Sequence, residues 1–95
     1  MKVNAKEIGA RIKKLRNQNE VTQDQLAEKL HIATNTLYRI ETGLRVASLD
    51  LFIEIADYFE VTLDYLILGR KSSKDSLKEK IRELIKFLIK WLEDL

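Results

Sequence analysis

The chain has 95 residues, no cysteine, no proline and a formal net charge of +2. This length allows one domain with one modest apolar core, and the absence of cysteine excludes a disulfide framework. Charged residues interrupt the most apolar run, 81–92, so it does not predict a membrane span. Because the N-terminus shows no secretory signal pattern, we expect a cytoplasmic protein.

The charges are unevenly divided along the chain. Residues 1–47 hold nine Lys or Arg and five Asp or Glu, whereas residues 48–70 hold one and five. Residues 71–95 hold seven and five. A basic first half followed by an acidic stretch indicates one side that faces a polyanion, although this asymmetry alone is weak evidence.

The first predicted helix covers about residues 5–18. Asn4 and Glu7 have the spacing of an N-terminal cap, and a stripe of apolar side chains follows at helical spacing. That stripe consists of Ile8, Ile12 and Leu15. The outer face is basic, with Lys6, Arg11, Lys13 and Lys14. Each of these lysines is as well explained by solvation as by a ligand.

Residues 22–43 are predicted to form two short helices joined by a tight turn. Thr22 and Gln25 match a capping box, which starts a helix from about Gln23 to Leu30. A second helix begins near Ala33 and ends at Gly43, a residue suited to the left-handed backbone that closes helices. Its outward side chains are Asn35, Tyr38, Arg39 and Thr42, and its inward ones are Ala33, Leu37 and Ile40. The outward set can form hydrogen bonds and carries positive charge, which suits DNA.

Two further helices are predicted before residue 70. Ser48 is placed to cap the fourth and Thr62 the short fifth, which Gly69 closes. Local rules are broken at three positions. His31 and Glu60 follow predicted helices without being glycine, so the backbone there either avoids a left-handed conformation or adopts it at a cost. Ala33 offers no side-chain acceptor as a cap.

Residues 70–75 are polar and predict a linker, after which Ser76 and Glu79 have the spacing of a cap. The final helix carries an a/d heptad seam, spaced 4, 3, 4, 3, 4. The seam consists of Leu77, Ile81, Leu84, Leu88, Trp91 and Leu95. Ile85, Ile89, Leu92 and Phe87 widen the apolar face to roughly 200°. Such a face predicts pairing between two chains, and the competing interpretation is a helix folded back on its own domain.

These motifs together resemble those of a known family. TQDQLAEKL, LYRIETG and SLDLFIEIADYFEVTLDYLILG are similar to the lambda-repressor-like, Cro/repressor (XRE-type) helix-turn-helix domain, over about residues 5–69. The resemblance implies an all-α fold: a five-helix DNA-binding domain in residues 1–69, the linker 70–75, and an appended amphipathic helix in 76–95. It also implies an ion pair between Arg16 and Glu41, which would tie the first helix to the end of the recognition helix.

The resemblance further implies that the helix from about residue 33 to 42 enters the major groove of double-stranded DNA. The expected base-contacting residues are Thr34, Asn35, Tyr38 and Arg39. The expected phosphate-contacting residues are Gln23, Thr42, Arg45, Lys6 and Arg11. Two such domains normally bind together, so the expected assembly is a homodimer joined by the C-terminal helix.

Three classes of function are therefore compared. The first is a sequence-specific transcriptional regulator of the repressor-like group, and it requires DNA and no cofactor. The second is an interaction or antitoxin-type module that holds a protein partner through the C-terminal helix. An enzyme or metal site is rejected, because the chain has one histidine, no cysteine and no glycine-rich phosphate loop.

Overall fold

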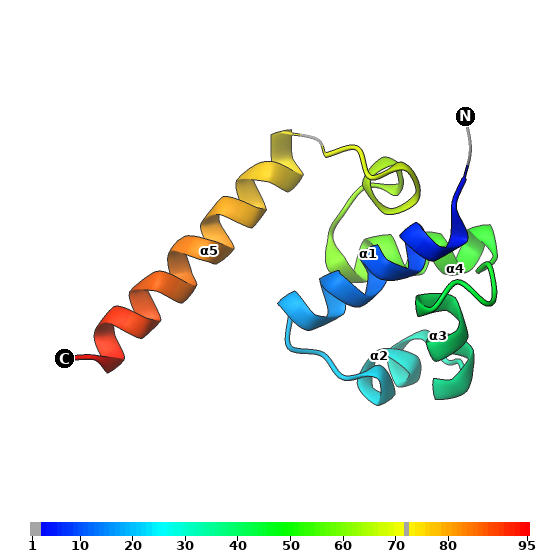
Figure 1. Cartoon of the computed structure of the whole chain (residues 1–95), viewed down its shortest axis with the longest axis horizontal. Coiled ribbons are helices and arrows are strands. Elements are labelled where there is room, and N and C mark those ends of the chain that lie inside the picture. The colour runs from blue at the N-terminus through cyan, green and yellow to red at the C-terminus, as the bar shows by residue number, and fades with distance from the viewer. Residues whose placement is uncertain (1–2, 72) are drawn as a thin grey trace.

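The regular elements in the described part of the chain, residues 3–71 and 73–95 of a computed structural model, are all helices (Figure 1). This confirms the predicted all-α class. The helices are α1 (Ala5–Gln18), α2 (Gln23–Leu30), α3 (Thr34–Glu41), α4 (Leu49–Phe59), the single π-helical turn η1 (Asp64–Leu68) and α5 (Ser73–Glu93).

Side chains cap α1, α2 and α4 where the sequence predicts. Asn4 accepts from the Glu7 amide at the start of α1, and Ser48 accepts from the Leu51 amide at the start of α4. The capping box of α2 is complete, since Thr22 Oγ1 accepts from Gln25 N at 3.1 Å and Gln25 Oε1 accepts from Thr22 N at 2.9 Å. Reciprocal bonds of this kind define where α2 begins.

Two of the three positions that break local rules adopt the left-handed backbone. His31 and Glu60 end α2 and α4 in this region, with φ of 55° and 54°. Neither residue is glycine, so both helix ends are closed at a conformational cost. Ala33 precedes α3 without a side-chain cap bond. The start of α3 is therefore fixed by other contacts.

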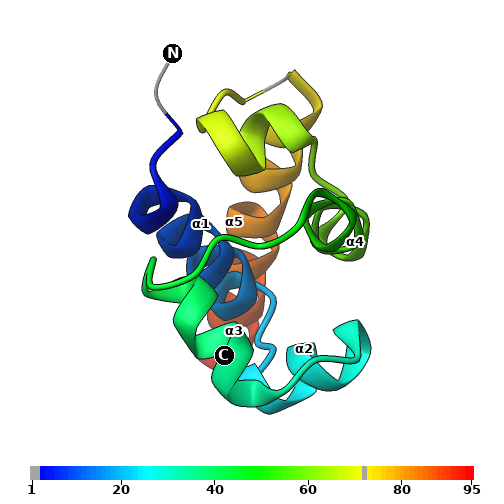
Figure 2. The same cartoon turned by 90° about the vertical axis from the view of Figure 1, so that its right-hand side faces the viewer.

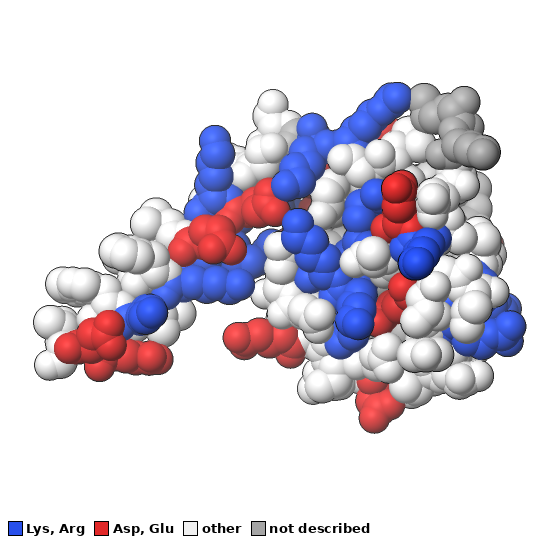
Figure 3. Space-filling model, viewed as in Figure 1, with Lys and Arg blue, Asp and Glu red and all other residues white. Residues whose placement is uncertain are grey.

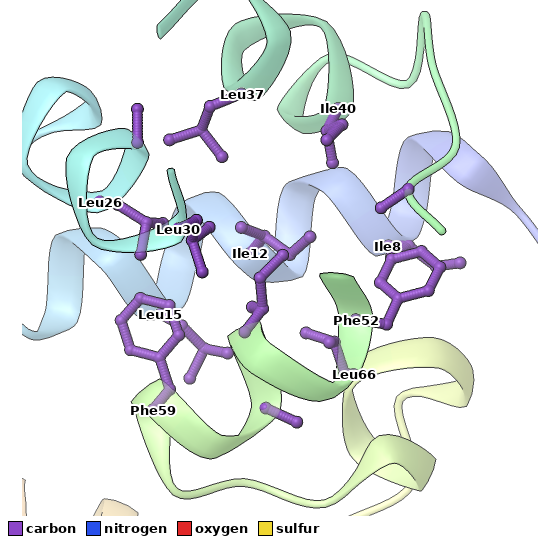
Figure 4. Packing of buried hydrophobic residues seen from close by; sticks show 14 of the residues in the cluster. Ile8, Ile12, Leu15, Leu26, Leu30, Leu37, Ile40, Phe52, Phe59 and Leu66 are labelled. Atoms are coloured by element: carbon purple, nitrogen blue, oxygen red, sulfur yellow. The ribbon is translucent and has the colours of Figure 1, made fainter. Parts of the chain in front are cut away.

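The apolar core lies around α1, which runs through the middle of the domain (Figure 4). Ile8, Ile12 and Leu15 of α1 are buried. In Figure 4, Leu37 and Ile40 of α3 lie on one side of α1, and residues of α4 and η1 lie on the other. The other labelled core residues are Leu26, Leu30, Phe52, Phe59 and Leu66. Burying the same α1 stripe against both sides places α3 on a rigid support.

Gly9 allows α1 and α3 to approach closely. A β-carbon at this position would lie 2.3 Å from the Ile40 carbonyl oxygen and 2.5 Å from that of Glu41. Both distances are far inside van der Waals contact, and the obstructing atoms are backbone. Gly9 is therefore required because α1 packs closely against α3 at this point, and not because the backbone turns there.

The connection to α5 differs from the prediction. The helix begins at Ser73, so the linker is shorter than 70–75, and Ser76 lies inside the first turns instead of capping them. Glu79, the expected partner of that cap, pairs with Lys71 and lies 3.9 Å from Lys14 Nζ. Ser76 and Glu79 therefore have the spacing of a cap without forming one, because Glu79 forms an ion pair with Lys71 instead.

α5 projects from the domain and does not fold back along it (Figure 1). Figures 1 and 2 show α2 and α3 at one end of the domain and η1 at the other, where α5 departs. In this structure the folded-back interpretation of α5 is therefore wrong, and its apolar face is exposed.

Candidate nucleic-acid interface

The outer face of α3 carries the side chains that the sequence predicts for base contact. Asn35 and Arg39 are exposed, and Tyr38 is 49% exposed, whereas Leu37 and Ile40 on the inner face are buried. These three outer side chains offer an amide, a phenol and a guanidinium on one helix surface. Such groups can donate to and accept from base edges in a groove.

Thr34 is held at the start of this face. It is partly buried, and its hydroxyl donates to Asp24 Oδ1 of α2 at 2.8 Å. The bond joins the first turns of α2 and α3, which compensates in part for the missing cap at Ala33. Thr34 therefore serves the geometry of the two-helix unit, and its oxygen keeps a lone pair for an external donor.

A buried ion pair fixes the other end of α3. Arg16 Nε donates to Glu41 Oε2 at 2.7 Å, and a second guanidinium nitrogen donates to Oε1 at 3.0 Å. Gln23 at the start of α2 also donates to Glu41 Oε1, at 3.0 Å. One carboxylate thus receives donors from α1 and α2 while belonging to α3. This arrangement sets the relative positions of all three helices.

The expected phosphate-contacting residues divide into two groups. Lys6 lies beside the end of α3, because a β-carbon on Gly43 would approach Lys6 Cα to 2.7 Å. Arg45 is exposed in the loop that follows. Thr42 is exposed and its hydroxyl donates to the Tyr38 carbonyl at 2.9 Å. These three side chains gather at the carboxyl end of α3, whereas Gln23 lies at the start of α2.

Arg11 does not belong with them. Its guanidinium donates to the carbonyl oxygens of Leu66 at 2.9 Å and Ile67 at 2.7 Å. These bonds tie α1 to η1, which lies at the end of the domain opposite α2 and α3 (Figure 2). The prediction that Arg11 contacts phosphate is therefore corrected to a structural role, which satisfies carbonyls at the end of the π-helical turn.

Positive charge is present beside the α3 face. On the side seen in Figure 3, Lys and Arg side chains lie over α1 and at the edge of the domain near α3. Among the described residues, no group of three or more His, Cys, Asp or Glu side chains could hold a metal ion. Within the same ranges, no helix is long and apolar enough to cross a membrane.

Comparison with known proteins identifies the family to which this arrangement of helices belongs. Residues 12–66 match the profile of the family described as Helix-turn-helix. The chain belongs to this helix-turn-helix family. The match identifies a DNA-binding domain and not an enzyme domain. It spans all of α2, α3 and α4 and parts of α1 and η1.

Three relatives of the helix-turn-helix chain are transcriptional regulators by name. It is 35% identical over 63 residues to the HTH-type transcriptional regulator YqaE of Bacillus subtilis (strain 168), covering 66% of this chain and 54% of that protein. It is 32% identical over 74 residues to the HTH-type transcriptional regulator ImmR of the same organism, covering 74% and 58%. The third, the HTH-type transcriptional activator BcrR of Enterococcus faecalis, is 29% identical over 65 residues, covering 68% and 32%.

The matched region therefore spans little more than half of the first two relatives, and less of the third. A crystal structure of a transcriptional regulator from Listeria innocua superposes with a TM-score of 0.62 and 23% identity, covering 92% of each chain. That likeness shows the fold of the helix-turn-helix chain.

The sequence analysis did not predict the structural roles of two residues in this helix-turn-helix unit, Gln23 and Gly9. Gln23 was expected at a phosphate, and its bond to Glu41 depends on the approach of α2 to α3. Gly9 carried one available signal, since a glycine inside an otherwise strong helix is costly and usually has a packing reason. Its contact with α3 supplies that reason.

Proposed function

We propose that this chain is a sequence-specific, double-stranded DNA-binding regulator of transcription that acts as a homodimer, with α3 in the major groove. The observation that supports this most directly is the outer face of α3, where Asn35, Tyr38 and Arg39 are exposed while the inner face is anchored. A face of this kind, on the second helix of a helix-turn-helix unit, is the one that reads base edges.

Asn35 is the principal proposed base contact. It lies in the first turn of α3, and an asparagine amide can pair with both N6 and N7 of adenine. Thr34, next to it, supplies a hydroxyl oxygen, and Tyr38 lies one turn further along. Arg39 reaches either a guanine or a phosphate, since its guanidinium suits both acceptors.

The proposed backbone contacts flank this face. Gln23 lies at the amino end of α2, where the helix dipole favours an anion, and its amide retains a second N–H beyond the bond to Glu41. Lys6, Thr42 and Arg45 lie at the opposite end of α3. Contacts of this kind position the domain without reading the sequence.

The proposed dimer is formed through α5. The six seam residues Leu77, Ile81, Leu84, Leu88, Trp91 and Leu95 are 47–84% exposed in the single chain. Soluble monomers rarely expose a continuous apolar stripe of this length. Pairing two chains would cover it and present two α3 helices to half-sites about 34 Å apart. A regulator of this kind would work in the cytoplasm, where bacterial DNA lies.

A second candidate function is favoured by the same exposed stripe. An interaction module, such as an antitoxin-type protein, would use α5 to hold a different protein. Phe87 and Leu92, each 65% exposed, widen the face beyond the seam and would serve as anchors for that partner. Light scattering separates the two, since a chain that is dimeric alone favours self-pairing and a monomer favours a foreign partner.

The DNA proposal is tested by selecting binding sites for the full chain from random duplex DNA, then measuring affinity for the selected site. Asn35→Ala should weaken binding by about 5- to 150-fold, the range for one bidentate base contact, and relax preference at one base pair. Lys6→Ala should weaken binding to all sequences alike and reduce the salt dependence.

The matched control is Asn17→Ala, which removes an exposed asparagine from α1. It should leave affinity unchanged. Selection that yields no preferred sequence, or an Asn35→Ala variant that binds like the control, would reject α3 as the reading helix.

A further inference from the structure

The apolar seam of α5 points away from its own domain. The residues of α5 that contact the domain are Asp75, Lys78 and Glu79, which lie against Thr62, Glu60, and Lys14 with Lys71 respectively. At about 100° per residue, these three lie roughly 100–200° around the helix from Leu77. The seam residues all lie within about 40° of Leu77 on the same scale.

The apolar face is not equally wide along the helix. In the first half of α5, the positions beside the seam are Lys78, Lys80 and Arg82. In the second half, the corresponding flanks other than Asp94 are apolar and exposed. These apolar residues are Ile85, Phe87, Ile89 and Leu92. Whatever covers α5 therefore contacts more surface near its carboxyl end, far from its own domain (Figure 1).

We propose that two α5 helices pair antiparallel over their whole length, so that the second half of each lies beside the first half of the other. This inference rests on the proposed homodimer and specifies its geometry. The seam then pairs as Leu77 with Leu95, Ile81 with Trp91, and Leu84 with Leu88, and each pair occurs twice around a two-fold axis near residue 86.

The size of Trp91 gives one argument for this orientation. Parallel pairing would place two indoles in one layer of the seam and two Ile81 side chains in another. Antiparallel pairing sets each indole against an isoleucine, which evens the volume of the layers. Mismatched volumes force strained rotamers or leave voids.

Charge gives a second argument. Lys80 lies in α5 and Asp94 directly follows it. Both occupy the position that precedes an a residue of the heptad, and such positions face each other across an antiparallel pair. The two-fold axis would then create two Lys80–Asp94 contacts of opposite charge. In the parallel alternative Lys80 faces Ile85, and its charge gains no partner. Across the described chain, Lys80 and Asp94 are both exposed and accessible to a second copy.

Antiparallel pairing also separates the two domains. Leu77 of one chain lies opposite Leu95 of the other, so the two Leu77 positions are about 27 Å apart along the pair, at 1.5 Å per residue. Parallel pairing would bring them to about 8–10 Å, the distance between packed helices. The two domains would therefore attach at opposite ends of the helix pair.

Disulfide cross-linking of the full chain tests this orientation, because the natural sequence has no cysteine. The double variant Lys80→Cys/Asp94→Cys should oxidise to a covalent dimer, whereas each single variant should not. The two positions are about 21 Å apart within one helix, so they cannot pair within a chain. Ile81→Cys alone should remain uncross-linked, because its partner position is Trp91.

Light scattering of the unsubstituted chain is measured in parallel. A dimer mass with cross-linking by Ile81→Cys alone would establish a parallel pair and reject this proposal while leaving the homodimer intact. A dimer mass with neither cross-link would also reject the proposed pairing. A monomer mass would reject both this inference and the homodimer, whereas the DNA selection tests the reading helix independently.

Discussion

Arg16 of α1 and Glu41 of α3 form a two-pronged ion pair in which both side chains are almost completely buried. The pair joins the central helix of the core to the end of α3. It carries additional bonds, since Arg16 also donates to the Val21 carbonyl and Gln23 donates to Glu41. Satisfied in this way, a buried pair specifies one geometry for α3.

Replacing Glu41 should therefore be costly. In Glu41→Ala the Arg16 guanidinium stays buried without its carboxylate, and we expect the free energy of unfolding to fall by about 3–5 kcal/mol. Equilibrium urea denaturation measures this change. Glu28→Ala removes an exposed glutamate from α2 and should change it by less than about 0.5 kcal/mol. Equal effects of the two substitutions would show that Glu41 in the buried pair contributes no more to the free energy of unfolding than an exposed glutamate.

The contact at Gly9 makes an unusual prediction for a glycine inside a helix. Gly9→Ala would raise helix propensity by about 1 kcal/mol in isolation. Because the new methyl group would overlap the Ile40 and Glu41 carbonyls, we expect net destabilisation and a displaced α3. Thermal unfolding and affinity for the selected DNA site should both decrease.

The exposed neighbour Ala10 provides the control for Gly9. Ala10→Gly should cost about 1 kcal/mol through propensity alone and leave DNA affinity unchanged, provided that the protein stays folded. A Gly9→Ala variant more stable than the natural chain would mean that α1 and α3 can separate freely.

His31 is predicted to accept glycine with a gain in stability. Its φ of 55° lies in the left-handed region, where an L-residue is disfavoured by about 1–2 kcal/mol. Part of that gain is lost to the greater freedom of glycine in the unfolded chain, so we expect His31→Gly to stabilise by about 0.5–1 kcal/mol. The exposed α2 position Glu28→Gly should instead destabilise by about 1 kcal/mol. Chemical denaturation distinguishes the signs.

The Lys71–Glu79 contact should give a measurable titration. The hydrogen bond from Lys71 holds the pKa of the Glu79 carboxyl below its ordinary value of 4.5 and raises the pKa of Lys71 above 10.5. The contact is thus fully present between these ordinary values. It is lost as pH falls through the lowered pKa of Glu79, or as pH rises through the raised pKa of Lys71.

Side-chain NMR should follow this titration directly. In the natural chain the Glu79 carboxyl should titrate below 4.5, and in Lys71→Met its pKa should move upward toward the ordinary value. An unchanged Glu79 titration in Lys71→Met would exclude Lys71 as the main cause of the shift.

The sequence was most informative where structure depends on near neighbours. The caps at Asn4, Thr22 and Ser48 were predicted because donor and acceptor lie three residues apart. The buried stripe of α1 was predicted because helical spacing selects one face. Such interactions can be predicted because the residues that form them lie close together in the sequence.

The sequence was misleading where a side chain forms its contacts with a distant segment of the chain. Arg11 lies on the outer face of α1 by helical spacing, but η1, more than fifty residues later, covers it and takes its donors. Glu79 has the spacing of a cap residue, but Lys71 and Lys14 determine where it points. Charged side chains are long enough for either outcome, and only the tertiary arrangement decides between them.

The buried apolar cluster of the domain contains, within the described residues, no side chain from α5. The domain that carries α3 therefore folds around one set of side chains, and the proposed pairing of chains depends on another set. In the proposed dimer, substitutions in the α5 seam would change which chain is bound without disturbing the domain that carries α3. After gene duplication, changes in this one helix would then let two copies associate separately while each keeps its own α3 surface.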